Sequence, residues 1–274
     1  MVPSPNANSS SEVSSPTSVV PGDAPHELVE PLQLHPTAER TPKQAGWFCP
    51  ASAKSARTIN PIRAIVDPIA RQIKSGIERG DGKDPISLAL GDPTVGGNLP
   101  PCPIAVDSVV KAALGKPHAA GYANACGIPE ARQAIANHHS YPEHQIGPEH
   151  VVVANGCSGA LELALTALLD NDTFILVPQP GFPLYQVIAE SHGAAVLHYR
   201  LKADRNWECD LEHLEELVAK HAGKVRGIVV NNPSNPTGAV FSEPHLAQIL
   251  EFASHNRLPV VADEVYGDLT FGSN

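Results

Sequence analysis

Residues 225–263 read VRGIVVNNPSNPTGAVFSEPHLAQILEFASHNRLPVVAD, and this stretch decides the fold class. A β-branched run, VRGIVVN, leads into a loop with two Asn-Pro steps, and the segment SEPHLAQILEFASHN then carries apolar residues at helical spacing. A second apolar run, PVVAD, closes the stretch. A strand, a helix and another strand in this order are typical of a β-α-β unit with parallel strands.

The same alternation begins near residue 151. Further strands are predicted at VVVAN (151–155), TFILVP (173–178) and AVLHY (195–199), and further helices at SGALELALTALLD (158–170), FPLYQVIAESHG (182–193) and DLEHLEELVAKHAG (210–223). Asp210 and Ser242 are placed as helix N-caps, and Gly193 and Gly223 follow their helices. We therefore predict an α/β fold with a mostly parallel sheet and right-handed crossovers.

The N-terminal part has a different character. Residues 1–56 contain Ser/Pro-rich tracts such as SPNANSSSEVSSPTS and are predicted to be a disordered tail. A helix is predicted within TINPIRAIVDPIARQI (58–73), a strand running into a Gly/Pro turn within PISLALGDPTVGG (85–97), and a further helix from about Pro129. The tail is acidic and has no Lys or Arg before Arg40, which is unlike a transit peptide.

Composition excludes several classes of function. The chain is 42% hydrophobic and 18% charged, and no apolar stretch approaches the ~20 residues of a membrane-spanning helix. Its net charge of −10 opposes binding to nucleic acid. The five cysteines are scattered and form no C-x-x-C pair, so neither a disulfide framework nor a metal site is expected, and a reducing, cytoplasmic location fits best.

Functional residues are expected at the carboxyl ends of the predicted strands, because ligands of open α/β sheets bind there. These ends carry NGCSG (155–159), PQPGFPLY (178–185), NNPSNPTG (231–238) and ADEVYGD (262–268). In the first, the free backbone N–H groups near Cys157 and Ser158 suit a phosphate, although Ser158 as a simple N-cap explains the pattern too. Phe182 either stacks its ring against a planar ligand or is a core residue.

The last two loops offer polar groups. The two Asn-Pro steps aim the Asn235 amide at a definite point, or else form an Asx-turn with no ligand. Asp263 ends an apolar strand, where burial disfavours a charge, so we expect a buried cationic partner for it. Glu264 is expected to be a solvated charge on the surface, as most glutamates are. Tyr185 is explained equally well as a packing residue and as a ligand contact.

Taken together, these segments resemble the fold-type I aminotransferases, which use pyridoxal 5′-phosphate, and among them the tyrosine aminotransferases. The resemblance rests on NPIRAIVD, LALGDPTVGGNLP, GYANACGIPEAR, NGCSGALELAL, LVPQPGFPLY, VVNNPSNPTGAVFS and ADEVYGDLTF, and it covers residue 58 to the end. It implies that residues 57–99 form an N-terminal arm and part of a small domain, and that residues 100–274 form an incomplete cofactor-binding large domain.

The resemblance also implies roles for individual residues. Cys157 and Ser158 hold the phosphate, Phe182 stacks on the pyridine ring, and Asn235 and Tyr266 bond its O3′ oxygen. Asp263 pairs with the protonated pyridine nitrogen, and this nitrogen is thus the expected cation. Gly91 lies near the substrate carboxylate, and Tyr122 reaches the phosphate of the neighbouring subunit, which makes a homodimer the expected active form.

The implied reaction transfers the amino group of tyrosine or another aromatic amino acid to a 2-oxo acid. In the family, the lysine that forms the Schiff base and the arginine that binds the substrate carboxylate lie further along the chain, beyond Asn274. Two strands that separate VVVAN from PVVAD in the sheet also lie there. We therefore expect the chain to be a truncated or incompletely predicted gene product, inactive by itself, with two unpaired strand edges.

Two other functions stay open at this point. The chain could be a non-catalytic module that binds pyridoxal phosphate or merely retains the scaffold, because fold alone does not fix function. It could also use the same cofactor as a C–S lyase or an aminocyclopropane-carboxylate synthase. The segment NPSNPTG departs from the NPSNPCG common in tyrosine aminotransferases, which bears on the substrate.

Overall fold

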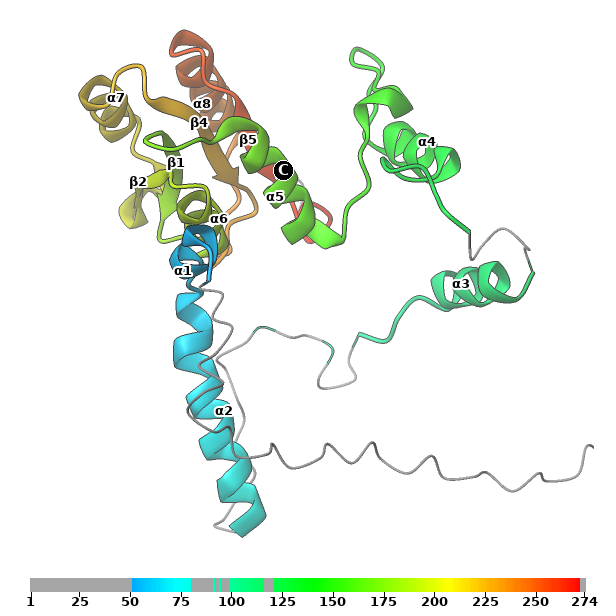
Figure 1. Ribbon diagram of the computed structural model, residues 1–274. Coiled ribbons are helices and arrows are strands. Elements are labelled where there is room, and N and C mark those ends of the chain that lie inside the picture. Colours follow the sequence, from blue (N-terminus) through cyan, green and yellow to red (C-terminus); the bar gives the residue numbers. More distant parts are fainter. Residues whose placement is uncertain (1–50, 80–90, 92–93, 95–98, 116–120, 272–274) are drawn as a thin grey trace, which may run out of the picture. The chain divides into compact units, whose positions relative to one another are not determined.

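The computed structural model describes residues 51–79, 91, 94, 99–115 and 121–271 (Figure 1). They belong to one unit, Pro50–Asn274. The tail predicted for residues 1–56 lies outside the described residues up to position 50, and its last residues include the start of a short helix, α1 (Ala53–Arg57). The strand predicted within 85–97 lies outside them too, except for Gly91 and Thr94.

Five strands form one sheet in the order β3-β2-β1-β4-β5. Their bounds are β1 (Phe174–Gln179), β2 (Ala195–Lys202), β3 (Glu208–Cys209), β4 (Val225–Asn231) and β5 (Val260–Asp263). The pairs β1–β2, β1–β4 and β4–β5 are parallel, whereas the two-residue strand β3 runs antiparallel to β2. The predicted mostly parallel sheet is thus confirmed, and β3 is an addition that the sequence pattern did not indicate.

Helices cover both faces of this sheet, because each central strand is apolar on both sides. On β1, Ile175 and Val177 pack into a cluster with α5 (Gly156–Leu168) and α6 (Leu184–Ser191), whereas Leu176 between them packs on the opposite face. That opposite face is covered by α7 (Leu211–Lys220) and α8 (Glu243–His255). Successive side chains of a strand point to opposite faces, so one apolar run supports both layers.

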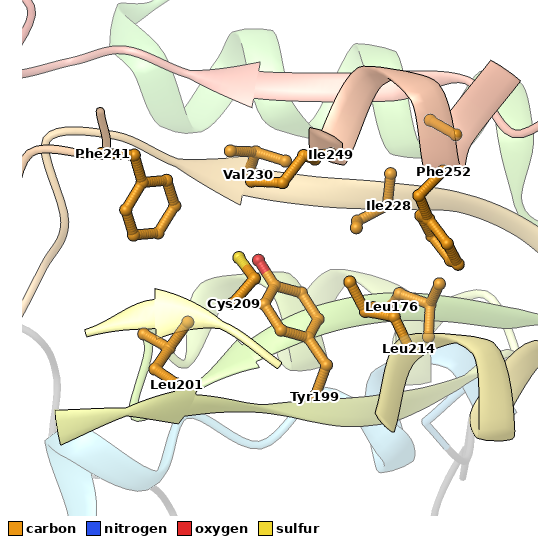
Figure 2. Close-up of a cluster of buried hydrophobic side chains, with 11 residues drawn as sticks. Leu176, Tyr199, Leu201, Cys209, Leu214, Ile228, Val230, Phe241, Ile249 and Phe252 are labelled. Carbon is orange, nitrogen blue, oxygen red and sulfur yellow. The ribbon is translucent and has the colours of Figure 1, made fainter. Parts of the chain in front are cut away.

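Figure 2 shows the cluster beneath α7 and α8, in which side chains from β1, β2, β3 and β4 meet those of the two helices. Tyr199 of β2 is fully buried there and donates its hydroxyl proton to the Val229 carbonyl at 2.9 Å. This bond satisfies the one polar atom of a large buried ring, which would otherwise cost free energy in an apolar layer. The core is therefore continuous from β2 to α8.

Three longer helices lie between α1 and α5 in the sequence. Helix α2 (Pro61–Arg79) confirms the predicted helical spacing and contains Pro68, and α4 (Pro129–His138) begins where it was expected. Helix α3 (Pro103–Gly115) was not anticipated, and none of its side chains is buried against other described residues. No helix in the described ranges is both long and apolar enough to cross a membrane.

The strand predicted at VVVAN is not formed. Residues 151–154 have no regular secondary structure and make no ladder, and Val153 donates its N–H to the Cys126 carbonyl instead. A β-branched run becomes a strand only when another strand accepts its hydrogen bonds. In the described part of the chain no strand lies beside it, and Val152 stays 54% exposed.

The helix-end predictions are confirmed in position. Asp210 caps α7 and its carboxylate accepts the His213 N–H, whereas Ser242 occupies the N-cap of α8 without a side-chain bond to that helix. Gly193 and Gly223 follow α6 and α7 with φ of 78° and 76°, the left-handed region that glycine adopts without strain. These residues mark where helices α6, α7 and α8 begin or end, and therefore where the chain turns between helix and sheet.

Candidate active site

A pocket of about 770 Å³ lies where the carboxyl ends of β1, β4 and β5 meet the N-terminus of α5. After β1 the chain adds β2 and β3 on one side of β1. It then crosses over and adds β4 and β5 on the other side, so the strand order reverses between β1 and β4. Ligands of open α/β sheets bind at such a reversal. The lining residues are Ile62, Ile65, Val66, Gly91, Cys157, Ser158, Leu161, Gly181, Phe182, Pro183, Tyr185, Asn231, Asn235, Pro236, Asp263, Val265 and Tyr266.

Asp263 is the buried carboxylate of this pocket, with 5% of its surface exposed at the end of β5. Its Oδ2 accepts the Tyr185 hydroxyl proton at 2.6 Å. Its Oδ1 has longer contacts, with the Val265 N–H at 3.3 Å and the Cys157 thiol at 3.5 Å. Among the described residues, no Lys, Arg or His forms an ion pair with Asp263.

Tyr185 stands in the first turn of α6 and is 1% exposed. Burial raises the pKa of its phenol well above the usual value, and the bond to the negatively charged Asp263 raises it further. The hydroxyl therefore stays protonated and remains a donor at every physiological pH. Its ring packs edge to face with Phe182, with centroids 5.9 Å apart and planes at 83°.

Cys157 lies in the first turn of α5, and its Sγ reaches the Asp263 Oδ1. Partial burial, followed by the charge of Asp263 and the hydrogen bond to it, raises the pKa of the Cys157 thiol to about 11. At neutral pH the side chain is thus a neutral thiol that donates to the carboxylate. It is neither a nucleophile nor a metal ligand in this state, because both roles need the thiolate.

The N-terminus of α5 provides backbone donors. Asn155 occupies the N-cap position, but its side chain makes no capping bond, and Gly156 begins the helix with φ of 68°. The first N–H groups of a helix have no partner within the helix, and the dipole there favours an anion. Cys157 and Ser158 carry two of these groups at the pocket wall.

Asn231 ties two loops of the pocket together. Its Oδ1 accepts the Asn235 N–H at 2.6 Å, and its Nδ2 donates to the Asp263 carbonyl at 3.1 Å. The side chain is 3% exposed, so these bonds form out of reach of bulk water. They fix the NNPSNPTG loop relative to the end of β5, and thereby the positions of Asn235 and Asp263.

The structure brings together seven of the eight site residues expected from the sequence. Gly91, Cys157, Ser158, Phe182, Asn235, Asp263 and Tyr266 all line the pocket. Tyr122 does not line it and is fully exposed, so its expected role at a neighbouring subunit stays a prediction. The cation expected beside Asp263 is the pyridine nitrogen of the cofactor, and this pairing stays a prediction. In the described part of the chain neutral donors hold the carboxylate.

Sequence reasoning missed Tyr185 and Asn231 as members of the site. Tyr185 has helical spacing with its neighbours, and a packing tyrosine gives the same pattern. Asn231 is the last residue of β4, and the sequence pattern does not distinguish it from the asparagines of the neighbouring Asn-Pro steps. In both cases the signal is a hydrogen bond between residues 32 and 78 positions apart, which no local pattern carries.

Comparisons with known proteins agree with this geometry. A family model described as aminotransferase class I and II matches residues 83–274. Tyrosine aminotransferase from Mus musculus is 42% identical over 229 residues, which cover 84% of this chain and 48% of that protein. The chain spans about half the length of the curated relatives that it matches.

Solved structures give the same result. Tyrosine aminotransferase from Leishmania infantum superposes with a TM-score of 0.69 at 28% identity, covering 79% of this chain and 54% of that one. Alanine aminotransferase from Pyrococcus furiosus reaches a TM-score of 0.73 at 30% identity, covering 82% and 55%. The matched residues include both the sheet and the pocket loops, and the chain belongs to the class I and II aminotransferase family.

Proposed function

We propose that this chain forms the cofactor-binding part of a pyridoxal-phosphate-dependent transaminase that transfers the amino group of tyrosine or another aromatic amino acid to a 2-oxo acid. The observation that carries the proposal is one pocket that contains both a buried carboxylate, Asp263, and the uncapped first turn of α5. The family supports the cofactor and the reaction class. The names of the curated relatives support tyrosine as the substrate.

The pocket residues fit pyridoxal phosphate chemically. The volume of about 770 Å³ is within the range of about 300–1,000 Å³ that is usual for small-molecule sites. Asp263 is buried without a described cationic partner, and its Oδ1 has only long contacts, so a protonated pyridine nitrogen would complete its environment. The N–H groups of Cys157 and Ser158 suit a phosphate dianion.

The other pocket residues supply orientation. Phe182 offers a ring to one face of a planar ligand, and its packing against Tyr185 limits its rotation. The Asn235 amide and the Tyr266 phenol can both hydrogen-bond a ring hydroxyl. Pyridoxal phosphate, when bound, supplies an electron sink for the bond that breaks at the substrate Cα. Asp263 favours that sink by holding a proton on the ring nitrogen, and Gly91 leaves room for the substrate carboxylate.

The proposal includes the assembly and the compartment. Tyr122 is fully exposed, which suits a residue that contacts a second copy of the chain, and a homodimer is the proposed active form. The described cysteines, Cys102, Cys126, Cys157 and Cys209, are free thiols, and a reducing compartment such as the cytosol suits them.

The test of cofactor binding uses pyridoxamine 5′-phosphate, which binds without a covalent bond to the protein. Calorimetry should show binding to the wild-type chain, and Asp263→Asn should weaken it about a hundredfold, because the pyridinium would lose its charged partner in a buried site. Asp210→Asn is the matched control, since Asp210 is equally buried, at 5% exposure, and lies outside the pocket. Equal binding by wild type and Asp263→Asn would contradict the proposal.

The reaction class needs a separate test on the protein purified from its natural source. Incubation with tyrosine and a 2-oxo acid should give one new amino acid for each tyrosine consumed, with no release of ammonia. A lyase acting through the same pocket would instead cleave the side chain of its substrate, and would not require the 2-oxo acid. A product analysis by mass spectrometry separates the two outcomes.

A further inference from the structure

Tyr185 makes contacts that the proposed function does not explain by itself. It donates to the Asp263 Oδ2 at 2.6 Å, the shortest of the three contacts to that carboxylate, and it packs edge to face with Phe182. It thus touches both the residue assigned to the ring nitrogen and the residue assigned to the ring face. It lines the pocket, although only 1% of its surface is exposed.

The two oxygens of Asp263 have different surroundings. Oδ2 is held by a buried phenol from α6. Oδ1 has only longer contacts, with the Cys157 thiol at 3.5 Å and the Val265 N–H at 3.3 Å. Hydrogen bonds to a carboxylate are strongest near 2.5–2.9 Å, so the bond on Oδ2 is firm and the contacts on Oδ1 are weak. An incoming donor can therefore replace the thiol on Oδ1 at little cost.

We propose that Tyr185 is a positioning residue that holds Oδ2 of Asp263 and so presents Oδ1 to the ring nitrogen of the cofactor. The inference rests on the proposed function, because it needs a pyridine ligand in the pocket. Tyr185 keeps the carboxylate plane fixed by donating to Oδ2. Through Phe182 it also fixes the distance between the ring face and the carboxylate. The Cys157 thiol occupies Oδ1 until the ligand arrives.

The test compares two ligands that differ at one atom. These are pyridoxamine 5′-phosphate and its 1-deaza analogue, in which a C–H replaces the ring nitrogen. The wild-type chain should prefer the pyridine ligand, and Tyr185→Phe should reduce that preference about tenfold, because a hydrogen bond to a charged group is lost. Tyr185→Phe retains the ring and its packing, so affinity for the deaza analogue should change little.

Tyr199→Phe is the matched control. Tyr199 is as buried as Tyr185 and also donates its hydroxyl proton, to the Val229 carbonyl, but it lies outside the pocket. Its removal should leave the preference between the two ligands unchanged. If Tyr185→Phe weakens both ligands equally, Tyr185 has only a structural role and the inference is overturned. If the wild-type chain binds neither ligand, the proposed function fails, and the inference fails with it.

A second measurement needs no variant and holds even if Tyr185→Phe does not fold. A crystal structure of the wild-type chain with pyridoxamine 5′-phosphate should place the ring nitrogen within hydrogen-bond distance of Oδ1, with Tyr185 still on Oδ2 and the Cys157 thiol displaced. A ring nitrogen on Oδ2, with the Tyr185 hydroxyl turned away, would overturn the inference while leaving the proposed function intact.

Discussion

Asp263 and Asp210 are both 5% exposed, yet different partners hold their carboxylates. Asp263 accepts hydrogen bonds from neutral groups, which leaves its charge without a described counter-ion. Asp210 lies between Lys202 and Arg200, at 3.0 Å and 3.1 Å, and also caps α7. A buried charge that is paired serves stability, and one that lacks a cation is available to a ligand.

Asp210 predicts an acid dependence of stability. Burial opposes its ionisation, but Lys202, the His213 N–H and Arg200 outweigh burial and lower its pKa to about 2. Since the unfolded value is about 3.9, the stabilisation is complete above about pH 4 and is lost as the pH falls toward 2. Asp210→Asn should lower the free energy of unfolding at pH 7 by about 1–3 kcal/mol.

Urea unfolding at a series of pH values checks this prediction. The wild-type chain should lose more stability than Asp210→Asn between about pH 4 and pH 2, because only the wild type has the group that titrates there. Parallel curves for the two proteins across that window would show that the ion pairs contribute nothing to folding.

Cys157 gives a second prediction for a single residue. With a pKa of about 11 it carries little thiolate at pH 8, so its alkylation by iodoacetamide should be about a hundredfold slower than that of an ordinary exposed thiol. Cys102, which is exposed and outside the pocket, is the internal reference. Peptide mass spectrometry measures both rates in one sample.

Asp263→Asn should speed the alkylation of Cys157, because it removes the charge that opposes the thiolate, and leave the rate at Cys102 unchanged. Equal rates at the two cysteines in the wild-type chain would contradict the contact between Cys157 and Asp263.

At the scale of an element, α5 connects backbone conformation to ligand binding. Its first residue, Gly156, has φ of 68°, and no described atom lies within 4 Å of a Cβ built there. A side chain at position 156 would therefore strain the backbone without clashing with neighbouring atoms. The strain matters because this turn precedes Cys157 and Ser158, which line the pocket and carry the N–H groups proposed to bind the phosphate.

Gly156→Ala should destabilise the chain by about 1–2 kcal/mol and weaken the binding of pyridoxamine 5′-phosphate. Gly223→Ala is the matched control, since Gly223 has φ of 76°, equally open surroundings and a place outside the pocket. It should cost similar stability with no change in affinity. Thermal unfolding and calorimetry on both variants separate the two effects. Unchanged affinity in Gly156→Ala would contradict phosphate binding by the N–H groups of Cys157 and Ser158.

At the scale of the whole molecule, the two apolar layers share one sheet. Leu165 of α5 packs on one face and Ile249 of α8 on the other, and strands β1 and β4 contribute side chains to both clusters. If the helices on one face unfold, the shared strands lose part of their packing, and the helices on the other face lose the sheet on which they pack. The sheet and its four covering helices should therefore unfold as one cooperative unit.

Leu165→Ala and Ile249→Ala should each lower the free energy of unfolding by about 2–5 kcal/mol in a single transition. Leu250→Ala, on the same helix but 58% exposed, is the control and should change it by less than about 0.5 kcal/mol. The fluorescence of Trp207, which packs against the α8 cluster, reports the transition in urea. Two separate transitions would show that the layers fold independently.

Much of the fold follows from local pattern. The periods of two and 3.6 residues place β1, β2, β4 and β5 and helices α5 to α8, because each element there has a continuous apolar face. The pattern fails at VVVAN and at β3. Residues 151–154 have the composition of a strand but no described partner, and β3 exists only because β2 offers it an edge. Pairing is a non-local property, so composition does not fix it.

The sequence by itself determined the order of strand ends and the residue types that follow each, and hence the seven pocket residues and the family resemblance. Tertiary structure alone decided the partners of Asp263. Tyr185 is 78 positions away and Cys157 is 106 positions away, and their hydrogen bonds depend on where α5 and α6 pack against the sheet. The two donors lie 2.6 Å and 3.5 Å from the carboxylate, and only the packed layers bring groups so distant in sequence this close together.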